Sequence, residues 1–117
     1  MPKPPLNQMT DASLRAYVDY GFRDRGDGVF ELKCRPEVEA QVYTMAPENG
    51  AFERLSEIKV PVQVVVGEVS RSIDPRFGAV IADALPNGTL EVMAGLDHFG
   101  PQQDPAVCVA SIRRFSI

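Results

Sequence analysis

The sequence predicts an α/β fold, and two observations carry this prediction. The segment VPVQVVVG, residues 60–67, is a near-continuous run of β-branched residues, as expected of a strand buried on both faces. The order strand, loop, Asp-Pro, helix occurs twice, over residues 62–85 and 90–115. Because strands that alternate with helices form parallel sheets with right-handed crossovers, the second half of the chain is expected to hold two parallel strands.

The front 58 residues are predicted to be mainly helical. A helix is expected over DASLRAYVDYGF, with Thr10 as its cap and Gly21 placed to end it. The composition of RDRGDG predicts a turn, and VFELK a short extended segment. Pro36 takes the first position of a second helix, PEVEAQVYTMA, which PENG ends. Apolar residues recur at helical spacing in both: Leu14, Tyr17 and Val18 in the first helix, Val38, Val42 and Met45 in the second.

The helices predicted for the second half each begin at an Asp-Pro pair. Asp74 and Asp104 are suited to cap a helix, and the prolines that follow them to occupy its first position. Between these helices, PNG predicts a tight turn and TLEVMA a second strand. Apolar side chains are expected on one stripe of each helix: Phe77, Ile81 and Leu85 with Val80 beside them, and then Cys108, Ile112 and Phe115.

The composition narrows the classes of function. The 117 residues include 44% hydrophobic and 24% charged residues, which is typical of one small soluble domain. No apolar run approaches the roughly 20 residues of a membrane span, and MPKPPLNQM lacks the apolar core of a secretory signal. Because the net charge is −4 and the only basic cluster is Arg113–Arg114, nucleic acid and anionic membranes are poor partners.

The two cysteines, Cys34 and Cys108, are far apart in the sequence and do not form a CxxC pair. We expect reduced thiols in a cytoplasmic protein, with a single disulfide as the alternative. One histidine with two distant cysteines makes no zinc ligand set, and the glycines stand alone in turns. The sequence therefore predicts neither a metal nor a cofactor.

The predicted sheet has an open edge. Two parallel strands do not make a stable sheet alone, since parallel sheets have both faces covered and usually four or more strands. A strand such as residues 62–66 would expose an unpaired edge that is ready to bind another strand. We expect either a partner that completes the sheet, such as a second copy or a complementing chain, or a longer protein of which this chain is a part.

Residues 55–115, from LSEIKVPVQVVVGEVS to VCVASIRRF, resemble the C-terminal end of an α/β-hydrolase, and LPNGTLEVMAGLDHFGPQQDP is the most specific part. Residues 10–54, with LRAYVDYGF, DG and LKCRPEVEA, resemble the end of that family's helical cap domain. The resemblance implies a partial α/β-hydrolase fold, with a cap-like segment over residues 1–54 and the last two strand–helix units of the core over residues 55–117. The aromatic residues Tyr17, Tyr20, Phe22 and Tyr43 would line a substrate pocket if the helices form a cap, or a helical core otherwise.

The resemblance implies a catalytic role for His98, the only histidine. His98 falls between the last strand and the final helix, where the family's general base lies, and a carboxylate there holds the imidazole in the right tautomer. For that carboxylate the resemblance leaves Asp74 as the candidate, although the residues favour the alternative, a helix cap before Pro75. Ser70 occupies the commonest position of the acid, and Glu68 is an alternative nearer to the strand. Some members take the acid from an earlier strand.

The family's nucleophile elbow, G-x-S-x-G or a relative with Asp, has no counterpart in these residues. The resemblance therefore implies a hydrolase of an ester or a similar small-molecule bond whose nucleophile and oxyanion hole are not in this chain. The alternative is a non-catalytic interaction or dimerising protein derived from the hydrolase fold. A third hypothesis is complementation, in which a separate half donates the missing strands and the nucleophile.

Overall fold

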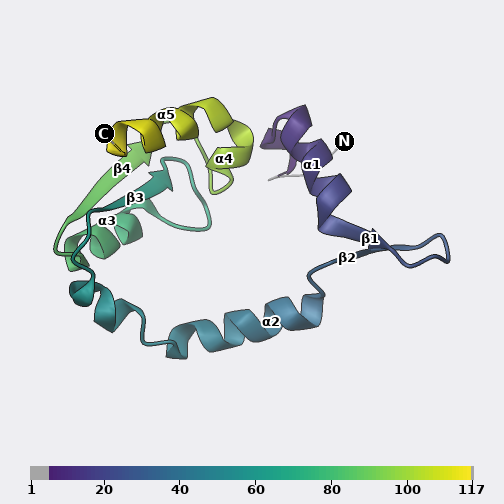
Figure 1. The fold of residues 1–117 in the computed structure, drawn as a ribbon, viewed down its shortest axis with the longest axis horizontal. Helices are drawn as coiled ribbons and strands as arrows, with labels where there is room; N and C mark the ends of the chain where they lie inside the picture. The colour runs from purple at the N-terminus through teal and green to yellow at the C-terminus, as the bar shows by residue number, and fades with distance from the viewer. Residues whose placement is uncertain (1–5, 117) are drawn as a thin grey trace. The chain divides into compact units, whose positions relative to one another are not determined.

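The computed structural model describes residues 6–116 of the chain. The chain divides into two compact units, one formed by residues 6–10 and 51–116 and the other by Asp11–Gly50. The larger unit holds a parallel pair of strands with a helix on each face, and the smaller unit holds two helices and a hairpin (Figure 1). None of the described helices is long and apolar enough to cross a membrane.

The smaller unit begins with helix α1, Asp11–Gly21, which ends at the glycine that the sequence places there. Strands β1, Phe22–Asp24, and β2, Phe30–Leu32, pair antiparallel, so the first two residues of the predicted RDRGDG turn belong to β1 and the turn follows them. Helix α2, Pro36–Met45, has Pro36 in its first turn as predicted. Strand β1 was not predicted, because Phe22 continues the apolar pattern of the preceding helix.

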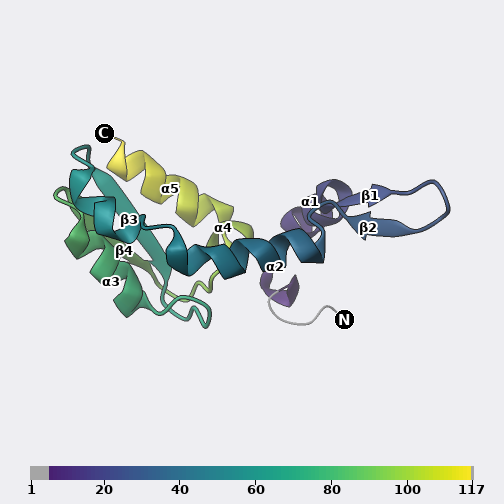
Figure 2. The ribbon, with the colours of Figure 1, turned by 90° about the horizontal axis from the view of Figure 1, so that it is seen from below.

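The larger unit contains the predicted parallel sheet. Strands β3, Val62–Gly67, and β4, Gly88–Met93, pair in parallel, with helix α3, Pro75–Ala84, as the connection between them. Helix α5, Pro105–Phe115, follows a short helix α4, Gly100–Gln103, that the sequence analysis did not predict. Helix α3 lies on one face of the strands and α5 on the other (Figure 2), while Val65 and Val92 stay 42% and 44% exposed. Short 3-10 helices at Leu6–Gln8, Ala46–Glu48 and Phe52–Glu57 complete the chain.

Both Asp-Pro pairs begin helices as predicted. The side chain of Asp74 accepts a hydrogen bond from the backbone N–H of Arg76, and that of Asp104 from the backbone N–H of Val107. Each carboxylate thereby satisfies an N–H that has no partner within its own helix. These local contacts explain why the starts of α3 and α5 could be located from the sequence.

The faces of α3 and α5 differ from the predicted stripes. On α3, the buried residues are Gly78 and Ala82, whereas Phe77 is 52% exposed. Gly78 turns this face to the sheet because it has no side chain: a Cβ there would lie 2.7 Å from Cγ1 of Val66 and 3.2 Å from Cδ1 of Leu90. Leu85, at the end of α3, is buried as the stripe predicted, with 6% of its surface exposed. A close approach of the helix backbone at Gly78, together with Leu85, therefore seats α3 on the sheet.

On α5 the most buried residue is polar. Ser111 is 1% exposed, while Ile112, which the sequence placed on the buried stripe, is 62% exposed. The Ser111 hydroxyl donates to Oε2 of Glu91 on β4 at 2.6 Å. Gln63 of β3 donates to the same oxygen at 2.6 Å, and Arg114 pairs with Oε1 at 2.6 Å. Glu91 therefore joins β3, β4 and α5. Because its carboxylate oxygens need hydrogen-bond donors, the helix α5 is rotated so that Ser111 and Arg114 face Glu91.

These contacts lower the pKa of Glu91, chiefly through the hydrogen bond from Ser111 and against the effect of burial. A carboxylate with a lowered pKa in the folded state stabilises the fold above its unfolded value, near 4.5, and loses that contribution as the pH falls further. The link between α5 and the sheet is therefore expected to weaken in acid.

Adding a methyl group at Gly78 is expected to destabilise the chain. Gly78→Ala must displace Val66, a cost of about 1–3 kcal/mol that the better helix propensity of Ala offsets by up to about 1 kcal/mol. Gly100→Ala is the matched control, because its new Cβ would meet nothing closer than Cδ1 of Leu96 at 3.4 Å. Urea unfolding should show a lower free energy of unfolding for Gly78→Ala alone, and an equal effect of both variants would contradict this account.

Removing the Ser111 hydroxyl is expected to reduce the acid sensitivity of the fold. Ser111→Ala removes the largest cause of the lowered pKa of Glu91, so the variant should lose less stability than the wild type as the pH falls below about 4.5. Ser116→Ala, which removes an exposed hydroxyl bonded to the carbonyl of Ile112, is the control. Thermal unfolding from pH 7 to pH 3 measures the difference, and parallel curves for wild type and Ser111→Ala would refute it.

Candidate functional site

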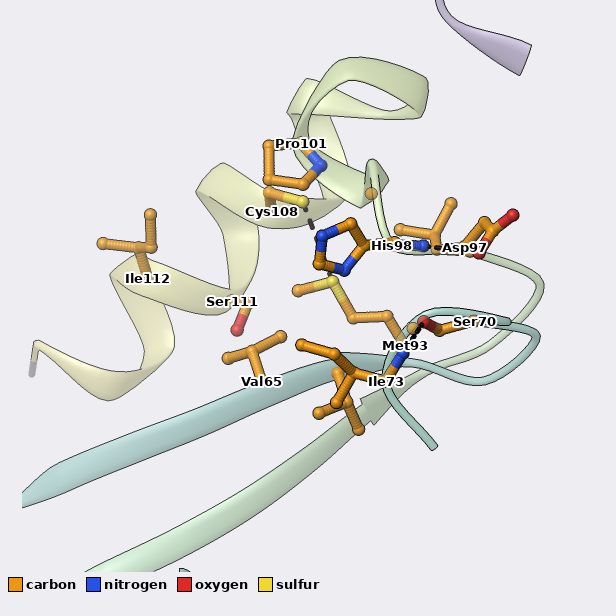
Figure 3. Close-up of a pocket in the computed structure, with 14 residues that line it drawn as sticks. Val65, Ser70, Ile73, Met93, Asp97, His98, Pro101, Cys108, Ser111 and Ile112 are labelled. Atoms are coloured by element: carbon orange, nitrogen blue, oxygen red, sulfur yellow. Dashed lines mark hydrogen bonds between the residues drawn. The ribbon is translucent and has the colours of Figure 1, made fainter. Parts of the chain in front are cut away.

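The candidate site is a pocket of about 320 Å³ in the larger unit, at the carboxyl ends of β3 and β4. Its walls come from the two loops that follow these strands and from α5 (Figure 3). The lining is mostly apolar, with a few polar groups near the loops. It comprises Val65, Val66, Gly67, Ser70, Ile73, Met93, Leu96, Asp97, His98, Gly100, Pro101, Cys108, Ser111 and Ile112.

The loop after β3 and the loop after β4 lie against each other and are joined by backbone hydrogen bonds. The backbone N–H of Glu68 donates to the carbonyl of Met93 at 2.9 Å, and that of Val69 to the carbonyl of Leu96 at 3.0 Å. Gly67 stands where the loops meet, and a Cβ there would overlap the carbonyl oxygens of Leu96 and Asp97. A glycine at the end of β3 is therefore needed for the loop of His98 to lie against it.

His98 lies on the loop between β4 and α4, and its imidazole points into the pocket toward Met93 and Cys108 (Figure 3). The ring meets that of Phe99 edge to face, with 5.3 Å between centroids. The side chain of His98 is exposed on its outer side. Among residues 6–116, no hydrogen bond joins the ring to a carboxylate, so the orientation of His98 rests on its backbone and on packing.

Asp97, which the sequence analysis did not name, holds the backbone at this point. Its Oδ1 accepts hydrogen bonds from the N–H of Arg71 at 3.2 Å and from the N–H of His98 at 2.7 Å. Its carbonyl accepts the N–H of Gly100 at 3.1 Å. One residue thus ties the loop after β3 to the loop after β4. The adjacent Asp-His pair was visible in the sequence, but the contact with Arg71 was not.

Asp74, the acid candidate from the sequence, does not line the pocket. Its Oδ1 accepts the N–H of Arg76 at 2.8 Å, and its Oδ2 pairs with the guanidinium of Arg76 at 2.7 Å. These hydrogen bonds lower the pKa of Asp74 to about 2. The structure thus brings His98 into the pocket and leaves Asp74 at the start of α3, engaged with Arg76.

The other two positions considered for the acid also have defined partners. Ser70 lines the pocket, and its Oγ accepts the N–H of Ile73 at 3.1 Å. Glu68 lies outside the lining, and its Oε2 accepts the N–H of Gly95 at 2.9 Å. Glu68 is exposed and also holds the turn after β4 through this hydrogen bond.

The pocket also contains a thiol. Cys108 on α5 donates to the sulfur of Met93 at 3.7 Å, and burial raises the pKa of this thiol. A raised pKa keeps the thiol protonated at neutral pH, which disfavours a nucleophilic role for Cys108. Both cysteines are free thiols in the structure. Within residues 6–116, no cluster of three or more histidine, cysteine or acidic side chains is placed to hold a metal ion.

Comparisons with known proteins identify the fold. The chain is similar to the crystal structure of E-2-(acetamidomethylene)succinate hydrolase, with a TM-score of 0.80 and 19% identity, over 93% of this chain and 40% of that one. It is also similar to an N-acyl homoserine lactone degrading enzyme, with a TM-score of 0.54 and 20% identity, over 94% of this chain and 53% of that one. No protein-family model matches the chain, and the curated proteins give no match either.

These likenesses show an α/β-hydrolase fold over the part that the chain covers. The chain spans about half the length of these structures or less, as expected for the C-terminal part of such a fold. The expected fold class, α/β with a partial α/β-hydrolase arrangement and parallel strands, is confirmed. At this level of identity the likeness concerns the fold and not the reaction.

The contacts of Asp74 predict a role in stability. Asp74→Ala removes both the helix cap and the partner of Arg76 and should lower Tm by a few degrees at pH 7, whereas Asp74→Asn keeps a cap acceptor and should lower it less. Because the pKa of Asp74 is about 2, the difference between wild type and Asp74→Ala should shrink as the pH falls from 4 to 2. Asp83→Ala, on the exposed side of the same helix, is the control, and an equal loss from it would contradict the capping role.

Proposed function

We propose that this chain, whose fold is that of the C-terminal part of an α/β-hydrolase, supplies the general base of a hydrolase that cleaves an ester or a similar small-molecule bond. The observation that supports the proposal most directly is the place of His98. Its imidazole points into the pocket at the carboxyl end of a parallel strand, on a loop fixed by hydrogen bonds to the loop of the neighbouring strand. Open α/β sheets bind their ligands at this edge.

In the proposed mechanism, the imidazole takes a proton from a hydroxyl nucleophile or from the attacking water. It then returns the proton to the leaving group. The nucleophile therefore does not have to ionise beforehand, and the leaving group does not depart as a free alkoxide. The mostly apolar lining of the pocket would lie against the substrate during this transfer. The nucleophile and the oxyanion hole would come from residues outside this sequence.

The proposal also has to account for the carboxylate that orients the imidazole of His98. The contacts of Asp74 with Arg76 support the capping alternative for this residue over the catalytic one. The position that most often carries the acid holds Ser70, whose hydroxyl is occupied by Ile73. An acid from an earlier strand, outside these residues, therefore fits the mechanism best.

A second candidate function, interaction without catalysis, is favoured by the outer edge of β3. The N–H groups of Val62 and Glu68 point to β4, so the alternation of a parallel ladder directs the backbone groups of Gln63 and Val65 away from it. Within residues 6–116, no strand pairs with this edge, and Val65 is 42% exposed. A second copy of the chain or a complementing chain could pair there. The cap-like role of residues 1–54 and a cytoplasmic location are further parts of the proposal.

The test starts from the native polypeptide that contains this segment, purified from its source cells with an antibody against the segment. Its hydrolysis of p-nitrophenyl acetate and of an N-acyl homoserine lactone is measured with and without His98→Ala. We expect kcat to fall by about 10²- to 10⁴-fold in the variant, as for loss of a general base. The control is Gln102→Ala, which shortens an exposed side chain of α4 between β4 and α5 and should leave kcat unchanged.

Two results would refute the catalytic proposal. Activity of His98→Ala within twofold of the wild type would remove His98 from the mechanism. A native polypeptide near 12.8 kDa that shows no hydrolysis and elutes as a dimer in size-exclusion chromatography would establish the interaction function instead.

A further inference from the structure

The side chain of Gln103, at the end of α4, connects two segments that are far apart in the sequence. Its amide oxygen accepts the backbone N–H of Asp97 at 2.8 Å, and its amide nitrogen donates to Oε1 of Gln8 at 2.9 Å. Gln103 is half-buried, which lengthens the lifetime of such contacts relative to a fully solvated side chain. A single amide therefore joins the residue before His98 to the start of the described chain.

On the pocket side, this contact completes the set of hydrogen bonds that fix the loop. Asp97 uses its Oδ1 for the N–H groups of Arg71 and His98, and its carbonyl for the N–H of Gly100. Its own N–H goes to Gln103. With all of these bonds made, the peptide groups on both sides of Asp97 are held, and the backbone of His98 has little freedom to rotate.

On the other side, Gln8 lies in the 3-10 helix Leu6–Gln8, which a second hydrogen bond also ties to α4. The N–H of Thr10 donates to the carbonyl of Gln102 at 3.0 Å. The next residue, Asp11, is the first of α1 and of the smaller unit. Residues 6–10 are therefore the covalent lead into that unit, and they are anchored on the helix that carries Gln103.

We propose that Gln103 is a positioning residue that holds the loop of His98 and couples its order to residues 6–10. A displacement of residues 6–10 would pull on the amide of Gln103, release the N–H of Asp97 and loosen the backbone of His98. The role needs an acceptor for the N–H of Asp97 and a polar partner for the amide of Gln8 on one side chain, which Gln103 supplies and alanine does not. The description of His98 as a base rests on the proposed function, whereas the coupling itself does not.

The test compares Gln103→Ala, Gln103→Glu and Gln8→Ala by amide hydrogen exchange in the 117-residue chain, followed by NMR. In Gln103→Ala, we expect the amide of Asp97 to exchange about five- to tenfold faster, the effect of losing one hydrogen bond, with the amide of Val64 in β3 unchanged. Gln103→Glu keeps an acceptor for the N–H of Asp97, and the amide of Gln8 can turn to donate to the carboxylate, so exchange at Asp97 should stay near that of the wild type. Gln8→Ala removes the link to residues 6–10 and should give exchange at Asp97 between those of wild type and Gln103→Ala.

Gln102→Ala is the matched control, because it shortens the neighbouring glutamine but keeps the carbonyl that Thr10 uses. Unchanged exchange at Asp97 in Gln103→Ala would overturn the proposal, and so would equal acceleration at Asp97 and Val64, which indicates general destabilisation. Wild-type exchange at Asp97 in Gln8→Ala would overturn the coupling to residues 6–10.

The same variants, placed in the native polypeptide, separate this inference from the proposed function. Gln103→Ala should lower kcat by about tenfold and leave KM unchanged, since the base is misplaced while the pocket is kept. An unchanged kcat together with faster exchange at Asp97 would show that Gln103 orders the loop without positioning a catalytic group, and would overturn the positioning role. If His98→Ala itself keeps full activity, the proposed function fails, and the exchange data still decide the coupling.

Discussion

The candidate site depends on the contact between the two loops that follow the carboxyl ends of β3 and β4. Parallel pairing brings both ends to one edge of the sheet, and backbone hydrogen bonds from Glu68 and Val69 then hold the loops together. The contact is close enough to require a glycine at position 67. Within this contact, the side chain of Asp97 accepts the N–H of Arg71 from one loop and the N–H of His98 from the other, so Asp97 links His98 to the loop after β3.

The second constraint is the attachment of α5, which forms a wall of the pocket. A carboxylate at Glu91, and not an apolar cluster, makes this attachment through Gln63, Ser111 and Arg114. Charge-assisted hydrogen bonds have stricter geometry than apolar contacts, so they fix the rotation of the helix as well as its position. The face that α5 presents to the pocket, including Cys108, follows from that rotation.

The proposed chemistry needs a nucleophile from outside this sequence, and the outer edge of β3 offers unpaired backbone groups to a further strand. The edge of β3 at Gln63 and Val65 has backbone groups that no strand within residues 6–116 uses, and the pocket that contains His98 lies beside this edge. An added strand there would extend the sheet, and its carboxyl end would lie near the imidazole. The catalytic and interaction hypotheses thus use the same part of the molecule, and the loop contacts of Asp97 and Gln103 serve either.

By itself, the sequence determined the α/β class, the parallel pair of strands and the starts of helices α3 and α5. These depend on periodicity and on contacts within a few residues, such as the cap from Asp74 to Arg76. The position of His98 between the last strand and the final helix was also readable, through resemblance to a known family. The short strand β1 and helix α4 were missed, because three or four residues carry too little pattern.

Only the tertiary structure decided which side chains hold the site. The hydrogen bond between Gln8 and Gln103 joins residues 95 positions apart, and that between Arg71 and Asp97 joins residues 26 positions apart. It also decided the faces of α3 and α5, where the absence of a side chain at Gly78 and the demand of Glu91 for donors outweigh the row of large apolar residues. Periodicity gives the spacing of a helix, but its rotation depends on the surface against which it packs.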